Sequence, residues 1–69
     1  MSCTRAECLM ALRKWNAPVD SATLAQWMGR STQLVSTNLM DLYARDIIDR
    51  KPRPEYPRRY LYFPKGLSS

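Results

Sequence analysis

The chain has 69 residues, no histidine, two cysteines, and eleven Lys or Arg against six Asp or Glu, which gives a formal net charge of +5. A chain of this length forms one domain with a small core, and it contains no apolar run near the ~20 residues of a membrane span. Two cysteines without histidine fall short of the ligand set of a structural zinc, so we expect no metal and no cofactor.

The cysteines and the N-terminal charges indicate the cellular compartment of the protein. Cys3 and Cys8 are five positions apart, so a disulfide between them would close a trivial loop, and we expect Cys8 to be a small core residue. Charged side chains between Arg5 and Lys14 interrupt the apolar stretch that a signal peptide requires. The sequence therefore predicts a soluble protein that stays in the reducing cytoplasm and contacts no membrane.

The positive charge is concentrated in the C-terminal third. Residues 1–44 carry four basic and three acidic side chains (+1), whereas residues 45–69 carry seven and three (+4). An anionic partner is therefore expected to meet the C-terminal third.

The first predicted helix begins with a capping box, in which Thr4 and Glu7 each satisfy a backbone N–H group of the first turn. Apolar residues at helical spacing give it one buried stripe, formed by Cys8, Leu9, Leu12 and Trp15. The helix ends within residues 16–18, because Pro18 disfavours helical backbone at the residue before it. Val19 can then add one short extended segment.

The segment that follows has the spacing of a helix-turn-helix. Asp20 is a good N-cap for a second helix over about Ser21–Met28, and Ala25 is small enough for a third helix to pass close. Gly29 can adopt the left-handed conformation that ends the second helix, and Val35 follows six residues later to pack between the two helices. An ordinary corner between two helices is the alternative interpretation of these positions.

The third helix is expected to begin at Ser31 or Thr32 and to end near Ala44 or Arg45. Its buried stripe consists of Val35, Leu39 and Leu42, helped by Leu34 and Tyr43. The opposite face carries Thr32, Gln33, Ser36, Thr37 and Met40. Hydroxyl and amide side chains of this length suit phosphate groups and base edges, whereas a plain solvated face is the alternative, since the face has no Lys or Arg.

Two strands joined by a proline-rich loop are predicted next. β-branched and aromatic residues occupy positions 46–51 and 58–63, and three prolines confine residues 52–57 to a loop. Alternation along the last strand gives one face with Arg59, Leu61 and Phe63 and another with Arg58, Tyr60 and Tyr62. We expect Leu61 and Phe63 to face the helices.

This order of elements resembles the winged-helix family of DNA-binding domains over residues 4–65. The resemblance is strongest in residues 42–50, which are similar to the end of the family's recognition helix, the turn and the first wing strand. The sequence departs from the family at Asp46, where glycine is usual, and Asp tolerates the left-handed conformation only at some cost. The implied fold is α+β: a small winged helix with three helices, a helix-turn-helix and a two- to three-stranded antiparallel wing. It forms a single domain over residues 1–69, with an ordered core at 4–65 and a flexible tail after it.

The ending Tyr60–Gly66 and the chain length are similar to those of the short fimbrial-operon regulators of enteric bacteria, which act on DNA together with a larger regulatory protein. Small phage and plasmid regulators share this build. The resemblance implies transcription regulation through sequence-specific or semi-specific binding of duplex DNA, with the recognition helix in the major groove and the wing on the backbone or in the minor groove. No long helix follows the second wing strand, so tight binding is expected to need self-association or a larger regulatory protein.

Carried over residue by residue, the resemblance implies two groups of DNA contacts. On and before the recognition helix they are Arg30, Thr32, Gln33, Ser36 and Thr37. On the wing they are Arg50, Lys51, Arg53, Arg58 and Arg59. A charged loop that serves only solubility is the alternative for the wing, but basic residues that alternate with proline and tyrosine form a stiff arm that loses little entropy on docking.

An enzyme is not expected, because the carboxylates are scattered, no Ser or Cys has a His partner, and there is no glycine-rich phosphate loop. A winged helix that binds a protein instead of DNA is the alternative, with Trp27, Met40 and the tyrosines of the last strand as its patch. Trp27 lies off the inner stripe of its helix, and we expect it to lean on the first helix.

Overall fold

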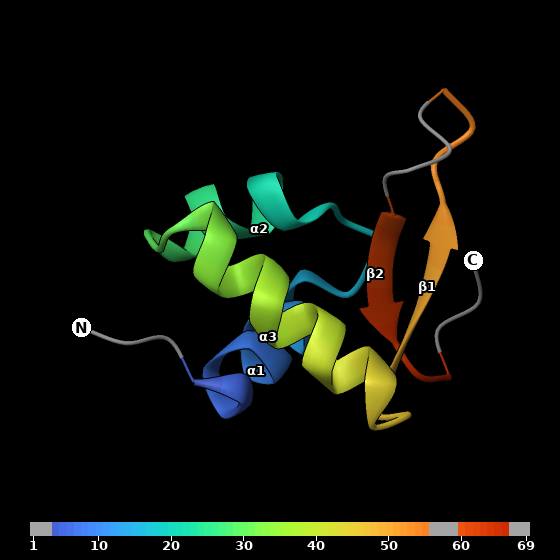
Figure 1. Ribbon diagram of the computed structural model, residues 1–69, viewed down its shortest axis with the longest axis horizontal. Coiled ribbons are helices and arrows are strands. Elements are labelled where there is room, and N and C mark those ends of the chain that lie inside the picture. The colour runs from blue at the N-terminus through green and yellow to red at the C-terminus, as the bar shows by residue number, and fades with distance from the viewer. Residues whose placement is uncertain (1–3, 56–59, 67–69) are drawn as a thin grey trace.

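Three helices and a two-stranded hairpin follow one another along the chain. The computed structural model describes residues 4–55 and 60–66. The elements are α1 (Arg5–Trp15), α2 (Ser21–Met28), α3 (Thr32–Ala44), β1 (Ile48–Pro52) and β2 (Tyr60–Pro64). In Figure 1, α3 runs across the front of the molecule, α1 lies behind it, and the hairpin stands beside the C-terminal end of α3. The predicted α+β class is confirmed, with a hairpin of two strands.

Local capping explains where the helices begin and end. The Thr4 hydroxyl accepts from the Glu7 N–H at 3.2 Å, and the Asp20 carboxylate accepts from the Thr23 N–H at 2.7 Å, so both predicted N-caps are confirmed. Asn16 ends α1 with a left-handed φ of 55°. Gly29 ends α2 with a φ of 69°, which a glycine adopts without a clash of its own Cβ.

The core lies where the three helices meet the hairpin. The inner stripe of α3 is confirmed, since Val35, Leu39 and Leu42 are almost completely buried. Buried residues of the other elements complete the cluster: Cys8, Leu12, Val19, Leu24, Ala25, Ile48 and Tyr62. The expectation that Leu34 and Tyr43 help to form this core was wrong, because their side chains lie at the edges of the stripe and are 41% and 39% exposed.

The hairpin is antiparallel and is tied to the helices by one further bridge. Ile48 pairs with Pro64, and Pro52 pairs with Tyr60. The N–H of Tyr62 donates to the Val19 carbonyl at 2.8 Å and the Val19 N–H donates back at 3.0 Å, which confirms the predicted extended segment.

The first strand begins two residues later than predicted because of the turn that precedes it. Asp46 adopts a left-handed φ of 62°, so the chain turns there before it extends. The Lys65 ammonium donates to the Asp46 carboxylate at 2.6 Å, which closes the open end of the hairpin. This hydrogen bond raises the pKa of Lys65 above its ordinary value.

The predicted orientation of the second strand was wrong. Cross-strand partners share a face of a hairpin, and the fully buried Ile48 fixes which face meets the core. Tyr60 and Tyr62 share that face, so Tyr62 joins the core cluster and Tyr60 packs against it. Phe63 is also buried, but it lies on the other face, outside that cluster.

Among the described residues, no helix combines the length and the apolar character needed to cross a membrane.

Candidate nucleic-acid interface

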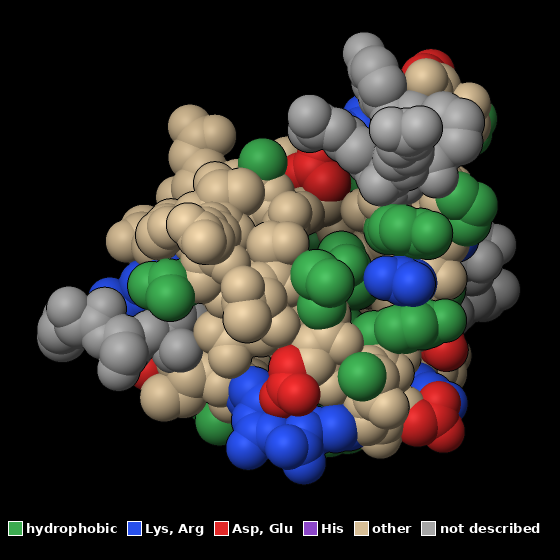
Figure 2. All heavy atoms as spheres, viewed as in Figure 1, with side chains coloured by type: hydrophobic (Ala, Val, Ile, Leu, Met, Phe, Trp, Pro, Cys, Tyr) green, Lys and Arg blue, Asp and Glu red, His purple; other side chains and the backbone are tan. Residues whose placement is uncertain are grey.

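The outward face of α3 carries neutral polar side chains together with Met40, which is 54% exposed. Thr32, Gln33 and Thr37 are exposed, and Ser36 is half-buried beside them. Figure 2, which has α3 across its front, shows this part of the surface almost free of charged side chains. Because the opposite stripe of α3 is held in the core, these side chains face solvent as one continuous row.

The N-terminus of α3 differs from those of the other two helices. Ser31 occupies the N-cap with extended backbone, but within the described chain its side chain makes no capping hydrogen bond. The backbone N–H groups of the first turn therefore keep their capacity to donate to an anion, beside Thr32 and Gln33. Sequence analysis did not identify this feature, because serine is normally read as a capping residue.

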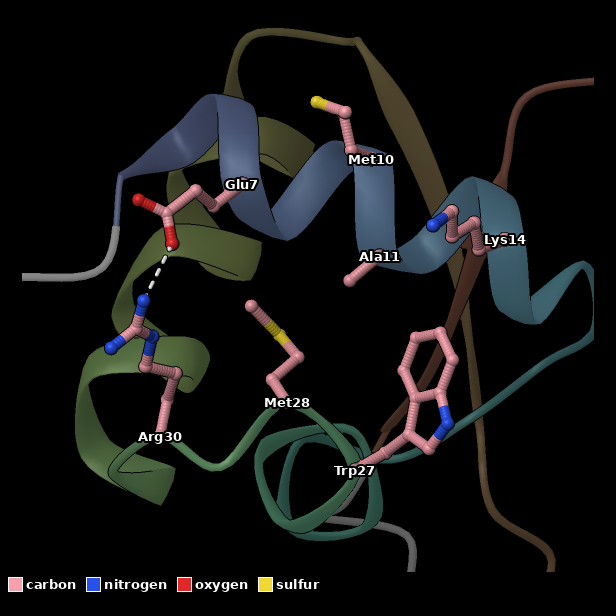
Figure 3. A pocket seen from close by; sticks show the side chains of 7 residues that line it. All are labelled: Glu7, Met10, Ala11, Lys14, Trp27, Met28 and Arg30. Atoms are coloured by element: carbon pink, nitrogen blue, oxygen red, sulfur yellow. Dashed lines mark hydrogen bonds and ion pairs between the residues drawn. The ribbon is translucent and has the colours of Figure 1, made fainter.

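Arg30 does not join the outward face of α3. Its guanidinium donates to the Glu7 carboxylate on α1 at 3.1 Å, and the side chain is 25% exposed. Figure 3 shows this ion pair closing one end of the space between α1 and the turn after α2. The structure thus separates Arg30 from the polar row that sequence analysis grouped with it.

Arg53 connects the hairpin to α2. Its guanidinium donates to Asp20 at 2.9 Å, and the two side chains are only 27% and 23% exposed. Asp20 uses its other oxygen to cap α2 at Thr23, so one carboxylate serves both the helix and the hairpin. A partly buried pair of this kind restrains the position of the hairpin more than an exposed pair would.

Arg50 is held between two tyrosine rings where α3 meets the hairpin. The guanidinium carbon lies 4.1 Å from the ring centroid of Tyr43 and 3.9 Å from that of Tyr60, and Figure 2 shows basic and hydrophobic side chains alternating over this junction. Burial lowers the pKa of Arg50, but favourable interactions with Tyr62, Tyr60 and Tyr43 outweigh it, so this pKa lies above its ordinary value. Stacking on both faces leaves the N–H edge of the guanidinium as its route to an anion.

The other predicted wing residues are placed differently. Lys51 is half-buried and pairs with Leu61 across the hairpin, so it lies on the face opposite Arg50. Arg58 and Arg59 lie outside the described residues.

A basic group that sequence analysis missed flanks the C-terminal half of α3. Asp41 accepts from Arg5 at 2.9 Å and from Arg45 at 3.2 Å. The hydrogen bond from Arg5 lowers the pKa of Asp41, with further contributions from Arg45. Two guanidinium groups share one carboxylate, so the cluster keeps a net positive charge beside the polar row. The spacing of Asp41 and Arg45 was visible in the sequence, but the approach of Arg5 depends on helix packing.

Comparison with known proteins supports the fold. No protein-family model matches the chain, and neither does any curated protein. Among solved structures, the chain is similar to a probable transcriptional regulator from Pseudomonas aeruginosa, with a TM-score of 0.73 and 19% sequence identity. The match covers 90% of this chain and 46% of the other, so this chain spans less than half the length of that protein. The three helices and the hairpin have the arrangement of a winged helix-turn-helix.

Proposed function

We propose that this chain binds double-stranded DNA as a small transcriptional regulator, in which α3 enters the major groove and the hairpin contacts the backbone or the minor groove. The outward face of α3 is the observation that carries this proposal, because a continuous polar row stands on a helix whose other side is locked in the core. Two further facts support it: the charge of +4 over residues 45–69 and the fold shared with a probable transcriptional regulator. Residues 1–69 act in this proposal as one domain.

The proposed contacts divide by chemistry. Gln33, Ser36 and Thr37 read base edges, because amide and hydroxyl groups can both donate and accept hydrogen bonds there. Thr32 and the open first turn of α3 bind a phosphate.

Arg50 has a distinct role among the basic residues. Its stacking between Tyr43 and Tyr60 restricts the guanidinium before DNA arrives, so little rotamer entropy is lost on binding a phosphate. Because one ring comes from α3 and the other from β2, the same stack sets the position of the hairpin relative to the helix.

The remaining basic residues contribute in two ways. Lys51, Arg58 and Arg59 add phosphate contacts. Arg30 and Arg53 already have carboxylate partners, so each would have to exchange a carboxylate for a phosphate, and each gives a smaller gain than a solvated cation.

The test is a salt titration of binding to random and genomic duplex DNA, followed by fluorescence anisotropy. Arg50→Gln is expected to weaken binding to all sequences and to flatten the plot of log K against log salt by about 0.9, the effect of one lost phosphate contact. Arg13→Gln, which removes an exposed arginine from α1, is the matched control and is expected to leave the slope unchanged.

A second arm of the same assay addresses sequence preference. Gln33→Ala is expected to reduce discrimination between sites by about 1–3 kcal/mol while non-specific binding stays nearly constant. If the wild-type chain binds no duplex even at low salt, the proposed function is wrong. If it binds and no substitution on the outward face of α3 changes site preference, direct reading of bases by α3 is wrong.

A further inference from the structure

A hollow lies between α1 and α2, and none of the proposed DNA contacts except Arg30 borders it. It has a volume of about 330 Å³ and is lined by Glu7, Met10, Ala11, Lys14, Trp27, Met28 and Arg30. Figure 3 shows Ala11, Trp27 and Met28 pointing into the space between the helices, while Met10 projects from the outer side of α1. An apolar cavity and an apolar projection thus lie side by side on one surface.

This surface exposes large apolar side chains that are held in place. Met10 is 63% exposed and Trp27 is 50% exposed. The Trp27 ring packs edge-on against Trp15 of α1, with the ring centroids 5.5 Å apart and the planes at 76°, which confirms the expectation that Trp27 leans on the first helix. A rigid exposed indole beside an exposed methionine is typical of a surface that another protein covers.

The charges along α1 indicate which kind of partner covers this surface. Glu7, Met10, Ala11 and Lys14 stand at i, i+3, i+4 and i+7, so they form one stripe of the helix. The stripe is acidic at its N-terminal end, basic at its C-terminal end, and apolar in the middle, where Ala11 permits close approach. When two such stripes meet antiparallel about a two-fold axis, Glu7 of each copy faces Lys14 of the other. The pattern is therefore complementary to itself, as an isologous interface requires.

We propose that the hollow is the interface of a two-fold homodimer, in which α1 packs antiparallel to α1 of a second copy and Met10 of each copy enters the hollow of the other. Glu7 already accepts from Arg30, but its side chain is 42% exposed, so its carboxylate can accept from Lys14 of the second copy as well. The contact involves about two helical turns and Trp27, which makes it smaller than a standard protein interface and the dimer correspondingly weak.

A single copy of this domain has one recognition helix, α3, whereas the dimer has two. If the proposed function holds, these two helices can recognise two half-sites related by the same two-fold axis. The interface itself is independent of that function, since it rests on the hollow and the α1 stripe and can be measured without DNA.

The experiment is sedimentation equilibrium of the full chain, without DNA, at concentrations up to about 1 mM, where even a dimer with a Kd near 1 mM is well populated. Lys14→Glu places two like-charged pairs in the interface and is expected to raise the dimer Kd roughly tenfold. Arg13→Glu makes the same charge change one residue away, outside the lining of the hollow, and is expected to leave the Kd nearly unchanged.

A charge exchange tests the antiparallel geometry directly. Glu7→Lys alone is expected to weaken the dimer, whereas Glu7→Lys combined with Lys14→Glu restores the opposite-charge pairs and brings the Kd back toward the wild-type value. Thermal unfolding of each variant shows whether it is folded, and Met10→Glu, at a solvent-exposed position, provides a second disruption that leaves the core intact.

Three results would overturn the proposal. The wild-type chain could remain monomeric at the highest concentration, which would show that the hollow is not a homodimer interface and that a protein that covers it must be a different one. Lys14→Glu and Arg13→Glu could weaken the dimer equally, which would show that the rise in Kd comes from the change in net charge and not from a contact of Lys14. The double exchange could fail to restore what Glu7→Lys loses, which would exclude the antiparallel pairing.

Discussion

Leu39→Ala tests the orientation of α3, on which every proposed base contact depends. Leu39 is completely buried in the cluster that joins the three helices to the hairpin. Removing its side chain is expected to lower the free energy of unfolding by about 2–5 kcal/mol, because apolar contacts are lost and a cavity remains. A domain of 69 residues has a total stability of only about 3–10 kcal/mol, so this single change removes about a fifth of it or more.

Urea unfolding followed by tryptophan fluorescence and circular dichroism measures the difference. Ser36→Ala, at the half-buried edge of the outward face, is the matched control and is expected to change the free energy of unfolding by no more than about 0.5 kcal/mol. Leu39→Met, which nearly conserves volume, should cost less than about 1.5 kcal/mol and so remain measurable if the alanine variant does not fold. Equal losses for Leu39→Ala and Ser36→Ala would show that α3 is rotated, and the base contacts would have to be reassigned.

Two further predictions concern a charge and a turn. The hydrogen bond from Arg5 holds the pKa of Asp41 below its ordinary value of 3.8, so this carboxylate stabilises the fold above that pH and the contribution is lost as the pH falls through the lowered pKa. Wild-type stability in urea should therefore fall more steeply below about pH 4 than that of Asp41→Asn, and parallel curves would show that the pair contributes nothing. Gly29 has a φ of +69° and nothing within 4 Å of an added Cβ, so Gly29→Ala should cost about 1–2 kcal/mol through backbone strain alone, and Gly29→Asn less; a neutral alanine variant would contradict the left-handed turn.

The helices and their faces could be predicted from the sequence because the signals are local. Thr4 and Asp20 cap residues three positions ahead of them, and Gly29 ends its helix through its own backbone freedom. The repeat of Val35 and Leu39 marks the buried stripe of α3, and the polar row follows as its opposite. Each of these inferences depends on residues within one or two helical turns.

The second strand could not be oriented in the same way. Its residues are apolar or aromatic on both faces, so alternation alone did not show which face meets the helices. The phase depends on the pairing with Ile48 and on the bridge between Val19 and Tyr62, both of which form only when distant parts of the chain meet. A shift of one residue in a strand exchanges its two faces, and this is why Leu61 and Phe63, rather than Tyr60 and Tyr62, were expected to face the helices.

Backbone capping and helical periodicity act between near neighbours, so the set of elements, the α+β class and the exposed row on α3 follow from the sequence alone. The partners of Arg30, Arg50 and Arg53, by contrast, depend on tertiary packing. Arg30 pairs with Glu7 across 23 positions and Arg53 pairs with Asp20 across 33, while Arg50 stacks on rings from two different elements. A long, flexible charged side chain pairs with an opposite charge that packing brings within its reach. Which charges come within reach depends on the folded structure and not on their positions along the chain.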